Sequence, residues 1–432
     1  MSQVKSPPHE VDRSNRQLSI LKQPHTRYNS DMIQEIPTTE PLEQQDPVEP
    51  LRVVLLADDR SIHRYGPVLR RIAVGLLDEV PDLSLVCLEP NKQLNLLPSP
   101  PLRLITQSPD QCDATSKFVA RTHRRVTLSK PLFPIFDKLM PSRRVNRLAD
   151  RLTEYKPTLI HALDEDHFWL ARRLSKQLQI PYVVSMLAAS RRHSGLSDKR
   201  CQGVFPCNAE SVRNMRKHNQ SLAKRVRLIP MGTHVSEQIA AFSRNRSTPW
   251  IMCCSEFKRG RGLTDLLHAL KSIETESLRP MLFLSGKGPL EHHLRREINK
   301  LELSSRVFVI PPTNDIILTN DAFKIVFHEI DIFVQASPMT AWQPEFLEAA
   351  SVGNAIITAK GSMNDLIDEK TGVTFQPGNR DSLANALTHL LSNPQAARDL
   401  ARNAQERLRK HFLASSMVDS LIQAYRKALS EK

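Results

Sequence analysis

Short apolar runs alternate with helical patterns of apolar residues along the first half of the chain. The β-branched run RVVLLA (52–57) precedes HRYGPVLRRIAVGLLDEV (63–80), whose apolar residues have helical spacing. LSLVCLE (83–89) predicts the next strand, and LIHALDEDHFWLARRLSKQLQIPYVVSM (159–186) repeats the strand–helix–strand pattern. VRLIPMG (226–232) predicts the last strand of this series. Such alternation is typical of parallel βαβ units, whose strands are buried on both faces.

The same pattern starts again in the second half. WIMCCS (250–255) predicts a strand, and LTDLLHALKSI (263–273) places four leucines on one helical face. Further strands are predicted at MLFLSGKGP (281–289), RVFVIPP (306–312), DIFVQAS (331–337) and NAIITA (354–359). Two such series predict an α/β protein of two doubly wound, Rossmann-like domains with a boundary near residues 235–248. Ligands in these folds bind beyond the carboxyl ends of the strands, so the expected site is a cleft between the two halves.

The first fifty residues differ in character. Residues 1–50 are rich in Pro, Gln, Ser and charge without an apolar period, which predicts a disordered tail. They lack the apolar core of a signal peptide, and no run of about 18 apolar residues occurs in the chain. The six cysteines show no CxxC spacing, which favours reduced thiols over a zinc site or disulfides. These features predict a cytoplasmic protein.

The net charge of +14 is concentrated in the first folded half. Residues 51–240 contain 31 Lys and Arg against 17 Asp and Glu, whereas residues 241–432 contain 24 against 21. A field of this sign favours an anionic substrate or surface, with a solvated basic face as the open alternative. Aromatic residues are only 5% of the chain, and no nucleic-acid motif combines them with the basic runs. We therefore expect an anionic or membrane-presented partner and no nucleic acid.

Two segments of the second half have the residue types that bind phosphate. SGKGPL (285–290) follows a predicted strand, and its glycines would let backbone amides approach a phosphate closely; a plain turn is the alternative. FKRGRGLTDLL (257–267) places Lys258, Arg259 and Arg261 just before a predicted helix. Cations at a helix N-terminus are unfavourable unless an anion lies there, and a diphosphate would be such an anion. A solvated basic loop is the other interpretation.

A third segment, EFLEAAS (345–351), contains a carboxylate in an apolar environment. Glu348 is surrounded by apolar residues in a short predicted helix between two strands. Ionised side chains are rarely buried without a partner. Glu348 therefore either lies at a partly solvated helix edge or is buried with a partner.

Taken in order, the motifs of residues 250–412 resemble the C-terminal domain of the family-4 retaining glycosyltransferases. The matching segments are RGRGLTDLLHAL, SGKGPL, HEIDIFVQAS, EFLEAASVGNAII, AKGSMNDLI and TGVTFQPGNRDSLANALTHLL. The first half matches more loosely, through LIHALDEDH, VFPCNAESVRNM and RLIPMGTHV. The resemblance implies the glycosyltransferase type B fold, in which two Rossmann-like domains face a cleft. Residues 51–240 would form a basic acceptor domain, 241–412 the nucleotide-sugar donor domain, and 413–432 a helix packing back towards the first domain.

The resemblance also implies roles for residues of the donor domain. Glu348 matches the second Glu of the family's Glu-x₇-Glu pair, which binds the ribose hydroxyls, and would lie in the cleft rather than be buried. Arg261 takes the place of the family's diphosphate-binding Lys, with Lys258 as a second candidate cation. Gly286 and Gly288 would line the nucleotide pocket.

Other positions depart from the family's pattern. Thr340 replaces the first Glu of the pair and is a candidate to hydrogen-bond the donor sugar, while Glu256 stands where the family has an Arg. The family's N-terminal Gly-Gly acceptor loop is reduced to Gly66, which is a further candidate for donor binding. His161 and Asp164, at the end of a predicted strand, are candidates to contact donor or acceptor from the opposite wall.

The implied activity is transfer of a hexose from a nucleotide-diphosphate sugar, with retention and without metal or other cofactor, in polysaccharide or glycolipid synthesis. The acceptor would be anionic or presented at an anionic membrane surface, to which the protein would bind peripherally on the inner face. The loss of the first Glu at Thr340 leaves an alternative open. This is a catalytically inactive relative that binds a nucleotide sugar or scaffolds glycan assembly.

Overall fold

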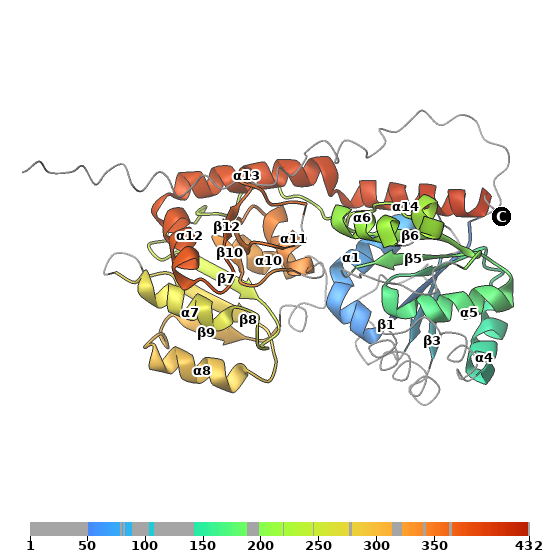
Figure 1. Cartoon of the computed structure of the whole chain (residues 1–432), viewed down its shortest axis with the longest axis horizontal. Helices are drawn as coiled ribbons and strands as arrows, with labels where there is room; N and C mark the ends of the chain where they lie inside the picture. Colours follow the sequence, from blue (N-terminus) through green and yellow to red (C-terminus); the bar gives the residue numbers. More distant parts are fainter. Residues whose placement is uncertain are drawn as a thin grey trace, which may run out of the picture. The chain divides into compact units, whose positions relative to one another are not determined.

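The structure of the protein is a computed structural model, drawn in Figure 1. The predicted tail lies outside the described residues. The segment Pro50–Lys432 forms one compact unit. The described residues are 51–77, 80, 83–88, 103–107, 142–187, 198–218, 220–244, 246–275, 279–312, 322–339, 343–362 and 365–430.

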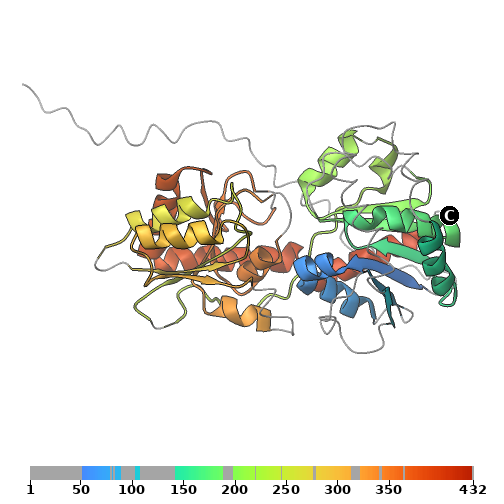
Figure 2. The same ribbon diagram turned by 90° about the horizontal axis from the view of Figure 1, so that it is seen from below.

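The first half contains a six-stranded parallel sheet in the order β3-β2-β1-β4-β5-β6. Figure 2 shows its strands and helices from a second direction. Alternate residues along its strands contact helices on opposite faces: α1 and α14 on one, and α4, α5 and α6 on the other. The strands are β1 (Val53–Asp58), β2 (Ser84–Leu88), β3 (Arg103–Gln107), β4 (Leu159–Ala162), β5 (Tyr182–Met186) and β6 (Cys201–Pro206). The helices are α1 (Asp59–Leu77), α4 (Ser142–Thr153), η5 (Glu165–His167), α5 (Phe168–Leu178), α6 (Ala209–His218) and η6 (Gln220–Arg225).

The last strand of this sheet is not the predicted one. β6 at 201–206 closes the sheet, and the prediction of a strand at 226–232 is wrong. The latter segment follows β6 only briefly, through backbone bonds from Arg227 N to Val204 O (3.0 Å) and from Ile229 N to Pro206 O (3.1 Å). Pro230 comes next and has no N–H to continue the ladder. The segment therefore leaves the sheet and leads to the second half.

The second half repeats the architecture, with a parallel sheet in the order β12-β11-β10-β7-β8-β9. One face packs against α7, α8 and α12, and the other against α10 and α11. Its strands are β7 (Trp250–Cys254), β8 (Met281–Ser285), β9 (Val307–Ile310), β10 (Ile332–Gln335), β11 (Ala355–Ala359) and β12 (Val373–Phe375). Its helices are α7 (Leu263–Ser272), α8 (Glu291–Lys300), α10 (Ala322–His328), α11 (Pro344–Ser351), α12 (Arg380–Ser392) and α13 (Pro394–His411). The last helix of the chain, α14 (Ala414–Ser430), packs against the first sheet. The strands predicted from residue 250 onwards are confirmed.

Both sheets have the same topology. Counted from the first strand of each half, the spatial order is 3-2-1-4-5-6, the order of the doubly wound Rossmann fold. The predicted fold class is therefore confirmed. In such sheets the strand order reverses between strands 1 and 4, and ligands bind there at the carboxyl edge. These switch points lie between β1 and β4 in the first sheet and between β7 and β10 in the second.

The two chain segments that connect the halves lie against each other. Thr233 N donates to Phe412 O (2.8 Å), and Ala414 N donates to Thr233 O (3.0 Å). Gly232 is required here, because a Cβ would lie 2.6 Å from the Cα of Ala414. Beyond this crossing α14 packs against α1, β5 and β6 of the first half. Within the described part of the chain, no helix has the length and apolarity needed to cross a membrane.

Candidate active site

Three strand-end loops meet at the switch point of the second sheet. The loops after β7 and β8 are joined by bonds from Phe257 N to Lys287 O (3.0 Å) and from Leu290 N to Phe257 O (2.9 Å). The first of these loops also contacts the end of β10, since a Cβ on Gly262 would lie 2.1 Å from the carbonyl oxygen of Ala336. Gly262 has φ +69°, a conformation that favours glycine, and α7 begins directly after it. The backbone thus brings the N-terminus of α7 to the carboxyl edge of the sheet.

The loop after β7 carries three cations and one carboxylate. Lys258 and Arg259 are exposed, and the Arg261 side chain is 29% exposed. Glu256 accepts hydrogen bonds from Lys258 Nζ (2.9 Å) and from Arg261 Nη2 (3.2 Å). These bonds, that of Lys258 first, lower the pKa of Glu256. Glu256 therefore holds the predicted cations Lys258 and Arg261 together. In the sequence Glu256 is a departure from the family's pattern, but its position two and five residues before these cations indicates the contact.

The two glycines of the loop after β8 are explained by backbone packing. A Cβ on Gly286 would lie 1.9 Å from Ser255 O, and one on Gly288 would lie 2.6 Å from Phe257 O. A side chain at either position would push the two loops apart. Their predicted role in lining a nucleotide pocket stays a prediction.

Glu348 is buried, and the prediction that it lies open in a cleft is wrong. Its side chain is 0% exposed, and Oε1 lies 2.6 Å from Nη1 of Arg71 on α1 of the first half. The hydroxyl of Thr233 lies 3.3 Å and 3.4 Å from the two carboxylate oxygens. Arg71 Nη1 also donates to Gly232 O (3.2 Å). The partner that the neighbouring sequence did not reveal is an arginine from the other half of the chain.

His161 is a core residue, and the prediction that it contacts donor or acceptor is wrong. It is 0% exposed on β4, with Nδ1 2.6 Å from Tyr425 OH on α14 and Nε2 2.9 Å from Ser185 Oγ on β5. Both ring nitrogens therefore have partners inside the protein. Burial lowers the pKa of His161 to about 3, so the imidazole is neutral at physiological pH.

Asp164 is also structural, which corrects its predicted role in substrate contact. It is 4% exposed, and its Oδ1 accepts hydrogen bonds from Asp166 N (2.9 Å) and His167 Nδ1 (2.5 Å), so that it caps η5. The next residue, Glu165, accepts a bond from Leu187 N (3.1 Å). Burial, with a smaller contribution from Asp164, raises the pKa of Glu165 to about 7. Sequence reasoning missed Glu165, although it lies three residues after the end of β4, at the switch point of the first sheet.

Two further predicted positions have different outcomes. Gly66 lies inside α1, next to Pro67, so the predicted acceptor loop is a helix at this point. A Cβ on Gly66 would meet no atom within 4 Å, so no close approach requires glycine here. Thr340 lies outside the described residues.

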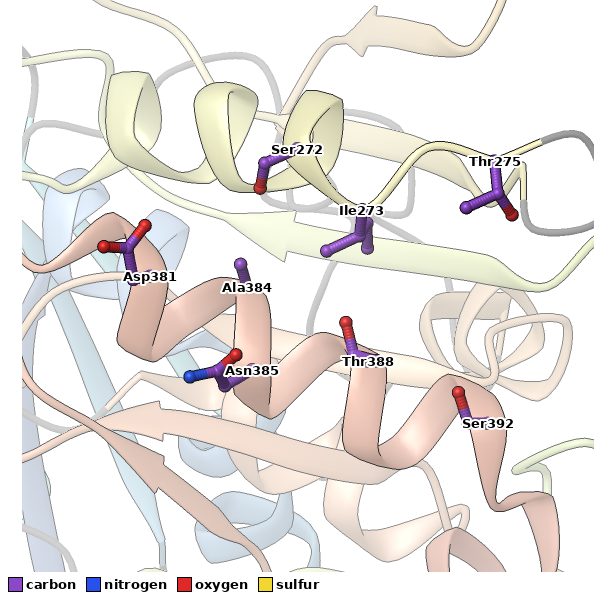
Figure 3. Close-up of a pocket in the computed structure, with 8 residues that line it drawn as sticks. All are labelled: Ser272, Ile273, Thr275, Asp381, Ala384, Asn385, Thr388 and Ser392. Carbon is purple, nitrogen blue, oxygen red and sulfur yellow. The ribbon is translucent and has the colours of Figure 1, made fainter. Parts of the chain in front are cut away.

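The second half also has a polar hollow of about 660 Å³ between α7 and α12 (Figure 3). It lies at the C-terminal end of α7, away from the strand ends described above, and it is lined by Ser272, Ile273, Thr275, Asp381, Ala384, Asn385, Thr388 and Ser392. The predicted site residues do not line it. The described residues contain no group of three or more His, Cys, Asp or Glu that could hold a metal ion.

The burial of His161 predicts a pH dependence of stability. Its folded-state pKa of about 3 lies below the usual 6.5, so the unfolded chain takes up this proton first as the pH falls. The free energy of unfolding should therefore lose about 1.4 kcal/mol per pH unit from this residue between about pH 6.5 and 3. Urea unfolding of the wild type and His161→Phe at several pH values measures the difference. Equal pH slopes for the two proteins would contradict the assignment.

Comparisons with known proteins bear on this site. Residues 235–407 match the family described as glycosyl transferases group 1. The O-antigen chain mannosyltransferase C of Escherichia coli is 23% identical over 73% of this chain and 86% of its own length. Among solved structures, a glycosyltransferase from Rickettsia africae has a TM-score of 0.66 at 11% identity, covering 88% of this chain and 99% of its own. Anabaena HepE, solved in complex with UDP and glucose, has a TM-score of 0.66 at 16% identity, covering 86% and 98%.

The two Rossmann-like sheets and the solved structures show the type B glycosyltransferase fold, and the matches to glycosyltransferases indicate a transferase enzyme. The group 1 match lies in residues 235–407, the part of the chain that contains most of the motifs resembling the family-4 glycosyltransferases. The resemblance found in the sequence is thereby confirmed.

Proposed function

We propose that this glycosyltransferase moves a hexose from a nucleotide-diphosphate sugar to an acceptor in polysaccharide or glycolipid synthesis, with retention and without metal. The observation that carries the proposal is the cationic loop of Lys258, Arg259 and Arg261 at the second switch point, directly before α7. An anion placed there would meet both the cations and the N-terminus of the helix. The HepE complex with UDP and glucose and the E. coli mannosyltransferase support a nucleotide-sugar donor.

The chemistry depends on the leaving group. As the bond between the anomeric carbon and the β-phosphate oxygen breaks, the electron pair and the negative charge pass to the diphosphate. The forked guanidinium of Arg261 and the ammonium of Lys258 would stabilise that charge. The acceptor hydroxyl adds to the anomeric carbon on the face that the diphosphate leaves, and its proton passes to a phosphate oxygen. Before the donor binds, Glu256 neutralises part of the loop, and the diphosphate would compete with it for the same cations.

The proposal is tested by following nucleotide release from UDP-, GDP- and ADP-sugars. The wild-type protein is mixed with a panel of anionic glycolipid and oligosaccharide acceptors in the presence of EDTA, since the proposed chemistry uses no metal. Acceptor-dependent release of one nucleotide, with an α-linked product from an α-linked donor, would support the full proposal. Activity that EDTA abolishes and a divalent cation restores would contradict the metal-independent part.

One alternative has a specific observation behind it. Thr340 stands where the family has its first Glu, and Glu348 is buried against Arg71. Both features fit a protein that binds a nucleotide sugar without transferring it, or that scaffolds glycan assembly. Binding of a nucleotide without release from any donor and acceptor in the panel would favour this alternative.

The charge of the first half predicts binding to anionic membranes, where the acceptor would be presented. We expect the protein to sediment with vesicles of phosphatidylglycerol and phosphatidylcholine but not with phosphatidylcholine alone, because each Lys or Arg near such a surface contributes about 1 kcal/mol. The double variant Lys217→Glu/Lys224→Glu, at exposed positions of α6 and η6, should bind less. Arg296→Glu/Lys410→Glu, exposed in the second half, has the same charge change and should bind like the wild type. Sedimentation that does not depend on lipid charge would contradict the prediction.

A further inference from the structure

The Arg71–Glu348 ion pair joins helices that belong to different halves of the chain. Arg71 lies in α1, which packs on the first sheet, and Glu348 lies in α11, which packs on the second. Both members of the pair also contact the connecting segment at residues 232–233, because Arg71 donates to Gly232 O and Glu348 accepts from the hydroxyl of Thr233. The same segment is hydrogen-bonded to the crossing between α13 and α14. Two helices and both connections are therefore joined at this point.

Because the pair is buried, a ligand has no access to the Glu348 carboxylate in this arrangement. Glu348 is 0% exposed, and the Arg71 side chain is 11% exposed. A ribose hydroxyl that bound Oε1 of Glu348 would compete with Arg71, and displacing Arg71 would leave its guanidinium with little solvent and without this carboxylate. Separating the members of a buried pair is strongly unfavourable. Every residue of α11 except Glu345 is buried, so the helix has little freedom to turn the carboxylate outwards.

We propose that Arg71 and Glu348 are positioning residues that tie the first half to α11, and that Glu348 does not contact the nucleotide. α11 is the next described element after the end of β10, which contributes Ala336 to the switch point. Through α11, the ion pair therefore holds in place the carboxyl edge of the second sheet, where the donor is proposed to bind. Recognition of the ribose falls to other residues. The nucleotide part of this inference rests on the proposed function.

The first experiment tests the tie without any ligand. Arg71→Met, Glu348→Gln and the double variant are compared with the wild type by thermal melting. The double variant should lose less than the sum of the two single losses in Tm, by more than about 4 °C. The matched control is the exposed Arg295–Glu291 pair on α8, 2.9 Å apart, whose variants should shift Tm by less than about 2 °C and additively. If the Tm losses of Arg71→Met and Glu348→Gln were additive, the two side chains would not be coupled, and the proposal that they tie the halves together would be wrong.

The second experiment tests for contact with the ribose. The nucleoside diphosphate among UDP, GDP and ADP that binds the wild type best is titrated beside its 2′-deoxy and 3′-deoxy forms. In Glu348→Gln and in Arg71→Met, affinity for all three forms should fall by a common factor, so that the ratio of deoxy to ribo Kd stays within about twofold of the wild-type ratio. A ratio that collapses towards one only in Glu348→Gln would show direct contact and overturn the proposal. Unchanged affinity in both variants would overturn the positioning role.

The two failures can be told apart. If the wild type binds none of the three diphosphates, the proposed function fails, and the melting cycle alone decides whether the pair ties the halves together. If a nucleotide binds but the Tm losses of the two single variants are additive, the proposed function stands and the proposed tie between Arg71 and Glu348 is wrong.

Discussion

Replacement of Arg71 by Met should lower the free energy of unfolding by about 3–5 kcal/mol, one of the largest effects of a single substitution in this protein. The cause is the carboxylate of Glu348, which is 0% exposed and would lose a partner 2.6 Å away. The hydroxyl of Thr233, 3.3 Å from the nearer oxygen, is a neutral donor and does not replace the lost charge. Met retains much of the apolar length of arginine, so the loss reports on the charge more than on packing. Urea unfolding at neutral pH, followed by circular dichroism, measures the effect.

A matched substitution separates this effect from the general cost of losing an arginine. Arg295→Met removes a partner 2.9 Å from Glu291 on α8, where both side chains are well exposed. Exposed pairs contribute at most about 1 kcal/mol, so this variant should unfold almost like the wild type. Similar losses for Arg71→Met and Arg295→Met would contradict the special role of the buried pair.

Replacement of Arg261 by Ala should reduce kcat/KM for the nucleotide-sugar donor by about 10²–10³-fold. This is the effect of removing one group that stabilises charge developing in a transition state. Arg261→Lys should retain part of the activity, because a lysine keeps the charge but cannot bind two phosphate oxygens in a fork. The measurement is the rate of nucleotide release at several donor concentrations.

The control for this prediction is another arginine beside the same helix. Arg380 binds Asp265, in the first turn of α7, at 3.0 Å and is half exposed. Arg380→Ala removes a guanidinium near α7 without touching the loop of residues 256–262, so kcat/KM should stay within about twofold of the wild-type value. A loss in Arg380→Ala as large as in Arg261→Ala would mean that the effect is not specific to the loop.

Local pattern was enough to predict most of the fold. The buried parallel strands are continuous apolar runs, and α7 presents Leu263, Leu266, Leu267 and Leu270 to the core as their spacing predicts. The cations at Lys258 and Arg261 were found for a similar reason, since a strand exit followed by a helix start is visible in the sequence itself. The wrong strand at 226–232 had the right composition. Pro230 and the adjacent chain crossing decide its conformation, and the pattern of apolar residues does not contain that information.

The environments of single side chains could not be predicted in the same way. Glu348 depends on Arg71, and His161 depends on Tyr425, and both pairs join distant parts of the chain. Because these partners come from helices packed in three dimensions, the sequence around each residue shows only that a polar group lies in an apolar segment. The family resemblance predicted an open Glu348, whereas the partner on α1 makes it a buried one. Asp164 was misassigned because a cap for a short helix and a substrate ligand use the same residue type at a strand end.

Binding of a nucleotide-diphosphate sugar at the loop of residues 256–262 can be measured by calorimetric titration. The wild type and Arg261→Ala are each titrated with UDP-, GDP- and ADP-sugars, with Arg380→Ala as the control. We predict that the sugars of one nucleotide bind to the wild type and to Arg380→Ala, and at least tenfold more weakly to Arg261→Ala. Equal affinity in wild type and Arg261→Ala, or no binding of any nucleotide sugar to the wild type, would contradict the account.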